Sequence, residues 1–540
     1  MLFAVACGSG SDAEGTSFGT MGTSGDAPTT STSPPTTVDP VTTSSPADTS
    51  TSSGGSSDDG FPGTPDLPPE DTETGDPPDA IPETCEDALL AASSMGCEFF
   101  AVELDNFGGG GTYAIVAANV QTDTVADVVV ETYDGAVWTA VAPAEQIAAM
   151  DAFVFVVGGT PIAGSGIDRT AYRVTSSVPI AAYQFNSYSA IATSDASLLL
   201  PTSAWDTLHR VASLERVDMD PFVWTSYFAV VAAHPDTALE IIATDDWLAG
   251  TGVSAAMDGE TVMLDLDVAQ VAQVAMSTDG PRDPTGTRID SGDVPVAVFG
   301  GTSCSIILDQ ETFGACDHLE EQLPGVRLWG ETFVAARAPV RSMSPTAEAS
   351  LWQIVASEDA TSVEITADAA VTGIPVGPVV LDAGEQVRFM VRGPADQPGD
   401  FYVESDNPVL LVNYTLSGDE LFDEFGNGSP GDPSMILLPP VEQYLPRYVV
   451  LVPAGWDQDV MTIVRPDGAG VMLDGVPVGD DVFYAVGPTH EVGRVVVADG
   501  LHRIEADVGV AITIVGYRSD DSYAYAGGIG TGVINPRPEG

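Results

Sequence analysis

The sequence predicts an all-β protein with four tandem antiparallel β-sandwich-like repeats of about 100 to 115 residues, preceded by a disordered stalk. Short apolar runs with a period of two recur between turn residues from about residue 112 to residue 530, and the helical period is nearly absent. One phrase of apolar, polar and again apolar residues returns four times over that range. By contrast, residues 8–82 contain too few spaced apolar side chains to build a core.

Residues 1–7 resemble the end of a bacterial lipoprotein export signal. Small and apolar residues precede Cys7, the arrangement in which a lipid is attached to the cysteine. We therefore expect Cys7 to be lipidated and the protein to lie on a bacterial cell surface, anchored in the outer membrane or extracellular. A chance cysteine is the alternative, because only six residues precede it and none is basic. No other stretch approaches about 18 uninterrupted apolar residues, so we expect contact with the membrane only through the lipid anchor.

Residues 8–82 have the composition of a tether. Ser, Thr, Gly, Pro and Asp dominate this segment, so the burial of apolar surface cannot offset the entropy lost on ordering it. We expect a flexible stalk that holds the folded part away from its anchor.

The charge of the chain excludes one class of partner. Seventy-nine acidic residues face seventeen basic residues, which gives a formal net charge of −62, and every basic residue is Arg. A chain this acidic repels phosphate backbones and anionic lipid headgroups. We therefore expect no nucleic-acid partner and no electrostatic docking on a membrane.

Four of the five cysteines form two pairs with the same spacing. Cys85 and Cys97 bound a short helical run within the lead-in at residues 83–111, and Cys304 and Cys316 are also twelve residues apart. In an exported chain, two such pairs predict two local disulfides and leave Cys7 for the lipid. Metal binding is the weaker alternative, because paired Cys-x-x-Cys spacing and neighbouring histidines at ligand distance are missing.

The repeats divide the folded region into units at residues 112–222, 223–333, 334–446 and 447–530, followed by a tail at 531–540. The repeated phrase is centred on Pro179, Pro295, Pro408 and Gly509, and it predicts a strand, a polar turn and a second strand. Segments such as Asp195 to Pro201 follow it, and we expect them to cross between sheets before proline ends the strand. Six or seven strands per unit favour a sandwich, whereas division into halves of about 50 residues would give propeller blades.

The motif around the second cysteine pair resembles a known family. Cys316-Asp317-His318-Leu319 is followed by Glu321-Gln322-Leu323-Pro324 and by Trp329-Gly330. This order is similar to that of the IgGFc-binding protein N-terminal domain family, over about residues 110–530. The resemblance implies a surface protein with an adhesive role. Animal members continue into cysteine-rich modules that this sequence lacks, so we do not expect immunoglobulin binding to transfer.

His318 is the strongest catalytic candidate in the motif. Asp317, Glu320 and Glu321 flank it, which would suit an acid-base or metal site. A histidine beside a disulfide more often fixes a corner of the backbone, and the other four histidines share no spacing with it. We therefore expect a structural role and no catalytic residues.

One acidic loop is the candidate for a ligand. Asp419, Asp423, Asn427 and Asp432 supply oxygen atoms, and glycines between them allow tight turns, so Ca²⁺ is the one cofactor that this loop could coordinate. A solvated acidic loop is the alternative, because the spacing of an EF-hand is missing.

These observations favour a cell-surface binding or adhesion protein that is not an enzyme. Its partner would be an extracellular protein or a glycan, contacted through loops of the tandem units. Two alternatives remain open: a secreted hydrolase of polysaccharide or peptide with a pair of carboxylates in a cleft, and a purely structural envelope protein.

Overall fold

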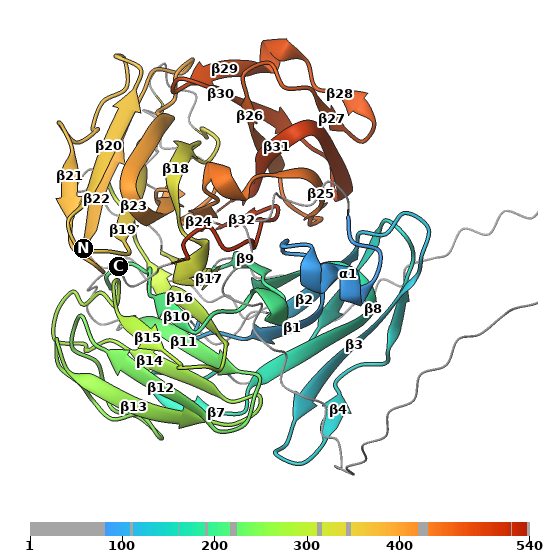
Figure 1. Ribbon diagram of the computed structural model, residues 1–540, viewed down its shortest axis with the longest axis vertical. Helices are drawn as coiled ribbons and strands as arrows, with labels where there is room; N and C mark the ends of the chain where they lie inside the picture. Colours follow the sequence, from blue (N-terminus) through green and yellow to red (C-terminus); the bar gives the residue numbers. More distant parts are fainter. Residues whose placement is uncertain are drawn as a thin grey trace, which may run out of the picture. The chain divides into compact units, whose positions relative to one another are not determined.

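Antiparallel strands account for most of the protein in this computed structural model, as the sequence predicts (Figure 1). The structure describes residues 81–107, 112–159, 161–188, 193–216, 224–309, 316–341, 347–418, 430–519 and 521–536. Within them, one α-helix, α1 (Cys85–Leu90), begins at Thr84, whose side chain accepts a hydrogen bond from the Asp87 N–H. Cys7 and residues 8–80 of the stalk lie outside the described residues.

The strands form four lobes that follow one another along the chain. Lobe 1 contains β1 (Gly96–Val102), β2 (Ala114–Asn119), β3 (Ala126–Tyr133), β4 (Trp138–Ala140), β5 (Glu145–Ile147), β6 (Asp151–Val156), β7 (Gly166–Asp168), β8 (Ala171–Asn186) and β9 (Asp195–Leu199). Lobe 2 contains β10 (Leu208–Arg210), β11 (Ser226–Ala232), β12 (Thr237–Ile242), β13 (Thr261–Leu266), β14 (Val271–Ala275), β15 (Arg288–Asp290), β16 (Val296–Ser305) and β17 (Asp317–Leu323).

Lobe 3 and lobe 4 repeat this plan. Lobe 3 contains β18 (Gly330–Ala335), β19 (Ser350–Ala356), β20 (Thr361–Ala367), β21 (Val379–Leu381), β22 (Gln386–Val391), β23 (Phe401–Tyr414) and β24 (Met435–Leu438). Lobe 4 contains β25 (Leu445–Val452), β26 (Gln458–Pro466), β27 (Val471–Leu473), β28 (Val476–Pro477), β29 (Phe483–Val486), β30 (His490–Val496), β31 (Gly500–Arg518) and β32 (Asp521–Ala526). Short 3₁₀ turns connect the lobes: η1 (Thr202–Ala204), η2 (Val326–Leu328) and η4 (Val441–Gln443), with η5 (Asp480–Val482) inside lobe 4.

The repeated phrase is a bulge rather than a turn in three of the four lobes, which corrects the sequence-based prediction. In lobe 1 the partner of β1 jumps from Ile180 to Thr175, so the residues between them bulge away from β1 while the strand continues, and Ser176 still pairs with Val128 of β3. The same jump occurs in β23 and in β31. The polar residues do not end the strand because each of its halves pairs with different neighbours. Only in lobe 2 do two strands, β15 and β16, replace the long one.

The two halves of each long strand therefore pair with different strands, and the sheet that they build curls around an apolar core. In lobe 3, the first half of β23 pairs with β18 and β20, and its second half pairs with β19 and β24. Cores of this kind fill each lobe, and the cores of lobes 1 and 4 are continuous. These curled antiparallel sheets support the all-β, sandwich-like prediction, and a propeller is not indicated.

The last strand of each lobe lies at the centre of the molecule. In Figure 1, β9, β17, β24 and β32 meet there while the other strands lie outside them, and these four strands pack against one another. The two ends of the β-region are also joined, because the Ser94 N–H donates to the Ile529 carbonyl at 2.9 Å. We call the line along which the four central strands meet the axis.

Candidate functional site at the axis

The family-like motif lies at the axis and is buried. Residues Asp317–Leu323 form β17, and none of these residues is more than 4% exposed. The strand extends the sheet of β16, just as β9, β24 and β32 extend the sheets of the long strands. The predicted crossing between sheets is therefore wrong, because pairing with the second half of each long strand keeps these segments in one sheet. Pro201, Pro324 and Pro439 do follow the ends of the central strands.

Asp195 joins all four central strands through its carboxylate. Oδ1 accepts hydrogen bonds from the backbone N–H groups of Ala196 in its own strand at 3.0 Å and of Ala524 in β32 at 3.4 Å. Oδ2 accepts from Glu320 in β17 at 3.2 Å and from Met435 in β24 at 3.1 Å. Burial raises the pKa of Asp195, and the backbone N–H groups at its oxygens oppose that rise. One side chain thus fixes strands from all four lobes.

A second layer of hydrogen bonds lies beside Asp195. The Ser197 hydroxyl accepts from the Gln322 N–H at 2.7 Å and lies 3.3 Å from a Glu321 oxygen. The other Glu321 oxygen accepts from the Leu437 N–H at 3.3 Å. The Leu200 N–H donates to the Gln322 side chain at 2.8 Å. The motif residues therefore hold strands of lobes 1, 2 and 3 together.

His318 lies in contact with Glu320. Its Nε2 lies 3.2 Å from a Glu320 oxygen, and both side chains are fully buried. Burial lowers the pKa of His318 to about 3 and raises the pKa of Glu320 well above its ordinary value. The other Glu320 oxygen accepts from the Gln184 side chain at 3.1 Å. The Nε2 atom of His318 thus contacts side chains, whereas the sequence predicts a histidine that fixes a corner of the backbone.

Three aspartates occupy corresponding places before or at the start of the central strands. Asp317, Asp432 and Asp521 are at most 2% exposed. Burial raises the pKa of Asp521 to about 6, although Arg518 and Ser194 oppose this. Burial, followed by the charges of the other two aspartates, raises the pKa of Asp317 well above its ordinary value. We call these three residues, together with Asp195, His318, Glu320 and Glu321, the axial cluster.

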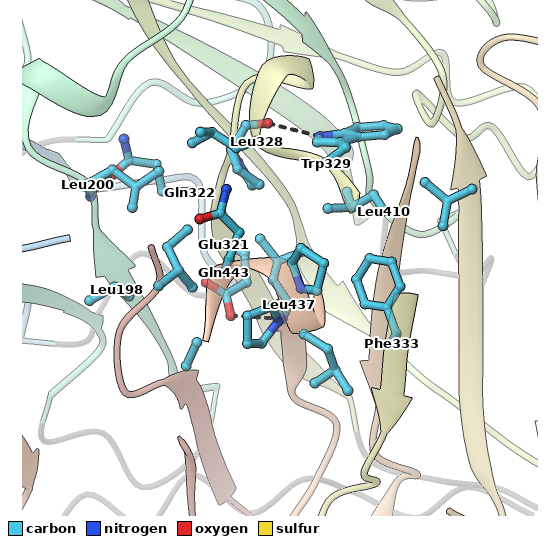
Figure 2. Close-up of a pocket in the computed structure, with 17 residues that line it drawn as sticks. Leu198, Leu200, Glu321, Gln322, Leu328, Trp329, Phe333, Leu410, Leu437 and Gln443 are labelled. Carbon is cyan, nitrogen blue, oxygen red and sulfur yellow. Dashed lines mark hydrogen bonds between the residues drawn. The ribbon is translucent and has the colours of Figure 1, made fainter. Parts of the chain in front are cut away.

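The cavity that the described residues form at the axis is too small for a substrate. A cavity of about 30 Å³ lies at the proline end of the central strands, lined mostly by apolar side chains such as Leu198, Phe333 and Leu437 (Figure 2). Figure 2 also shows Glu321 and Gln322 beside it. A volume of this size suits one or a few water molecules, whereas ligand pockets are about 300 to 1,000 Å³. Two larger grooves, of about 650 and 460 Å³, are lined by other residues.

The predicted calcium ligands are not brought together by the described part of the chain. Asp419, Asp423 and Asn427 lie outside the described residues. Asp432 is buried, and its Oδ1 accepts a hydrogen bond from the Gly418 N–H at 2.8 Å. Within the ranges that the structure describes, no group of three or more His, Cys, Asp or Glu side chains has the geometry of a metal site.

Both predicted disulfides are present. Cys85 is bonded to Cys97, with Cα atoms 5.7 Å apart, and Cys304 is bonded to Cys316, with Cα atoms 5.3 Å apart. The second disulfide joins the end of β16 to the residue before β17. It therefore fixes the start of the motif strand beside the axis. None of the helices in the described ranges is long and apolar enough to cross a membrane.

Sequence reasoning missed the most connected residue of the cluster. Asp195 has no histidine or cysteine beside it, so nothing in its own lobe marks it. The available signal was an aspartate at or just before the start of each central strand, at positions 195, 317, 432 and 521. An aspartate that recurs at corresponding positions of four repeats indicates that the four side chains lie in corresponding places of the fold.

Comparisons with known proteins give a family match and a similar human protein. A family model described as IgGFc binding protein matches residues 195–516, which is more than half of the chain. The chain is also similar to the IgGFc-binding protein of Homo sapiens, with 25% identity over 283 residues. That similarity covers 52% of this chain and 5% of the human protein. The matched range begins at Asp195 and contains the whole motif strand.

Proposed function

Because this chain belongs to the IgGFc-binding protein family, we propose that it is a cell-surface protein that binds an extracellular partner without catalysing a reaction. The partner is a protein or a glycan, and the chain contacts it through the exposed loops and strand edges of the four lobes. A protein partner is favoured, because the human relative is named for binding one.

The burial of the axial cluster is the observation that carries this proposal. Burial shifts the pKa values of His318, Glu320 and Glu321 in the direction that is typical of active sites, but all three side chains are enclosed. A general acid must come within hydrogen-bond reach of its substrate, and the cavity beside Glu321 holds only about 30 Å³. The cluster therefore serves to hold the lobes, and contact with a partner is left to the surface.

The proposed location rests on the disulfides and on the N-terminal sequence. Disulfides persist in oxidising compartments, and both described pairs are bonded. Lipid attachment at Cys7 followed by the stalk would place the lobes outside the cell, at a distance from the membrane. Labelling with a radioactive fatty acid, in the wild type and in Cys7→Ala, tests the anchor separately from binding.

Binding of the purified full chain to an array of extracellular proteins and glycans tests the proposal. The array includes immunoglobulin Fc, and each well is read for bound chain and for released product. Parallel arrays contain Ca²⁺ or a chelator, which tests the candidate ligands Asp419, Asp423, Asn427 and Asp432. Glu321→Gln serves as an internal control, since a buried framework residue should alter stability and leave surface contacts in place.

Saturable binding without product, retained by folded Glu321→Gln, is the expected result. A loss of binding in the chelator alone would add Ca²⁺ to the proposal. Product formation would contradict it and favour the hydrolase. An array with neither binding nor product would favour the structural envelope role.

A further inference from the structure

The strand β6 in lobe 1 is an apolar strand at the open edge of a sheet. Its sequence from Ala152 to Val156 contains no charge, and only β2 pairs with it among the described residues. Phe153 is 38% exposed and Val156 is 59% exposed, in a chain with a net charge of −62. Proteins usually protect open edges with charged side chains, proline or a bulge, because unpaired edges bind other strands. None of these devices occurs between Ala152 and Val156.

The register with β2 shows which backbone groups face outward. The Val157 N–H donates to the Tyr113 carbonyl at 3.1 Å, and the same register pairs Phe155 with Ile115. In an antiparallel ladder, alternate residues direct both backbone groups to the partner, and the residues between them direct both groups away. Val154 and Val156 therefore present their N–H and C=O groups to the open side. No hydrogen bond to these groups occurs within the described ranges.

The equivalent edges in lobes 2 and 4 are already occupied by a strand. In lobe 2 the outer edge of β14 pairs with β7, and the Ala275 N–H donates to the Ser165 side chain at 3.0 Å. In lobe 4 the outer edge of β30 pairs with β29. The occupant in lobe 2 is an extended segment that comes from another lobe. These edges show that the fold accepts an added antiparallel strand at this position.

The edge in lobe 3 is held by side chains instead. Arg388 in β22 forms ion pairs with Glu215 and Asp283 of lobe 2, at 3.3 and 3.6 Å. Arg392, just beyond β22, pairs through its backbone with Thr372. The edges compared are the outer edges of β6, β14, β22 and β30. Among the described residues, only the outer edge of β6 has neither a paired strand nor an ion pair to a neighbouring lobe.

The boundary between lobe 4 and lobe 1 is also the least connected by charge. Arg169 joins lobe 1 to lobe 2 through Asp267 at 2.5 Å, and Arg494 joins lobe 4 to lobe 3 through Asp400 at 2.8 Å. No ion pair connects lobe 4 to lobe 1 within the described part of the chain. These two lobes are joined by their continuous apolar core and by hydrogen bonds such as that from the Ser194 hydroxyl to Asp521.

We propose that β6 is a docking edge to which an extended segment of a partner protein adds as a further strand. This inference rests on the proposed binding function and specifies how one partner is held. The segment would donate to and accept from Val154 and Val156, and its apolar side chains would cover Phe153.

Charge identifies the kind of segment that fits. A second copy of this chain carries the same net charge of −62, so the pairing of two β6 edges brings two acidic bodies together. A segment of another protein with alternating apolar residues and basic flanks has no such repulsion. We therefore assign the edge to a basic, apolar, extended segment of a different protein.

A designed peptide and three variants of the full chain test this assignment. The probe is a short peptide in which valine and threonine alternate between flanking arginines, and the control peptide has the same sequence with alternate amides methylated. Val154→Pro removes one outward N–H and retains the ladder with β2, because edge strands tolerate proline at such positions. Val156→Lys places a charge on the edge. Val380→Lys is the matched control, since Val380 lies on the edge strand β21 of lobe 3 and is 62% exposed.

Titration by fluorescence anisotropy and hydrogen exchange of the Val154 and Val156 amides give the readout. We expect the probe peptide to protect both amides of the wild type from exchange. We expect Val154→Pro and Val156→Lys to weaken the affinity for the peptide by about tenfold or more, the scale of a lost main-chain pairing. We expect Val380→Lys to stay within about twofold and the methylated peptide not to bind.

Equal binding by wild type, Val154→Pro and Val156→Lys would overturn the assignment, as would unchanged exchange at saturating peptide. A dimer of the full chain that Val154→Pro dissociates would also overturn it, because the occupant would then be a second copy. If array partners bind Val154→Pro as well as wild type, this inference fails and the proposed function stands. If nothing on the array binds wild type, the proposed function itself fails.

Discussion

The boundary between lobes 3 and 4 and the boundary between lobes 4 and 1 join neighbouring lobes in different ways. At the first, Arg494 donates to both Asp400 oxygens at 2.8 and 3.0 Å and to the Arg337 carbonyl at 2.9 Å. At the second, no ion pair occurs among the described residues, and an apolar core runs from lobe 4 into lobe 1, with the rings of Tyr183 and Tyr525 centred 4.8 Å apart. The fold therefore does not need an ion pair at every boundary, because apolar packing and the hydrogen bonds of Asp195 at the axis also join the lobes. The outer edge of β6 in lobe 1 likewise has no ion pair to a neighbouring lobe among the described residues, and no strand pairs with it there.

The largest effect is expected from a change at the axis. In Asp195→Asn, one oxygen that accepts two backbone N–H groups becomes a donor, whichever way the amide lies. Each buried donor left without an acceptor costs about 1 to 3 kcal/mol, so the free energy of unfolding should fall by about 2 to 6 kcal/mol. Chemical denaturation measures this loss, with the exposed Asp258→Asn as its control. A variant as stable as Asp258→Asn would show that the axis does not hold the lobes.

A smaller loss is expected where an ion pair closes a boundary. Arg494→Met leaves Asp400, whose side chain is 1% exposed, without its cation, although the Arg337 N–H still donates to it at 2.8 Å. Because removing one partner of a buried pair is costly, the free energy of unfolding should fall by about 3 kcal/mol. Chemical denaturation again provides the measurement.

Arg169→Met is the matched variant at the boundary between lobes 1 and 2. Its partner Asp267 is 47% exposed, so water replaces the lost contact and the free energy of unfolding should fall by less than about 1 kcal/mol. Equal losses in Arg169→Met and Arg494→Met would mean that burial of the carboxylate does not set the strength of a boundary.

The sequence predicts the local features of this protein better than its centre. The twelve-residue spacing is enough to predict both disulfides, because Cys85 and Cys97, like Cys304 and Cys316, are held close by their own chain. The phrase at residues 176–179 reads as a turn, since its polar residues and proline are typical of turns. It is a bulge because distant strands pair on either side of it, and pattern alone does not show them.

The axial cluster depends on contacts that no local pattern contains. Asp195 meets Glu320, Met435 and Ala524, which are 125, 240 and 329 residues away in the sequence. The burial of His318 likewise depends on strands of several lobes, so its motif could be read as an acid-base site or as a structural corner. The open edge of β6 was not predicted, because period-two patterning does not show which strand lies at the end of a sheet.

Hydrogen exchange of the free full chain compares the open edge of β6 with the occupied edges in one sample. We expect the amides of Val154 and Val156 to exchange nearly as fast as exposed backbone. The amide of Phe155, which faces β2, and that of Ala275, which donates to Ser165, should be protected. If the amides of Val154 and Val156 are as protected as that of Ala275, the outer edge of β6 is already occupied and is not the open docking edge that we propose.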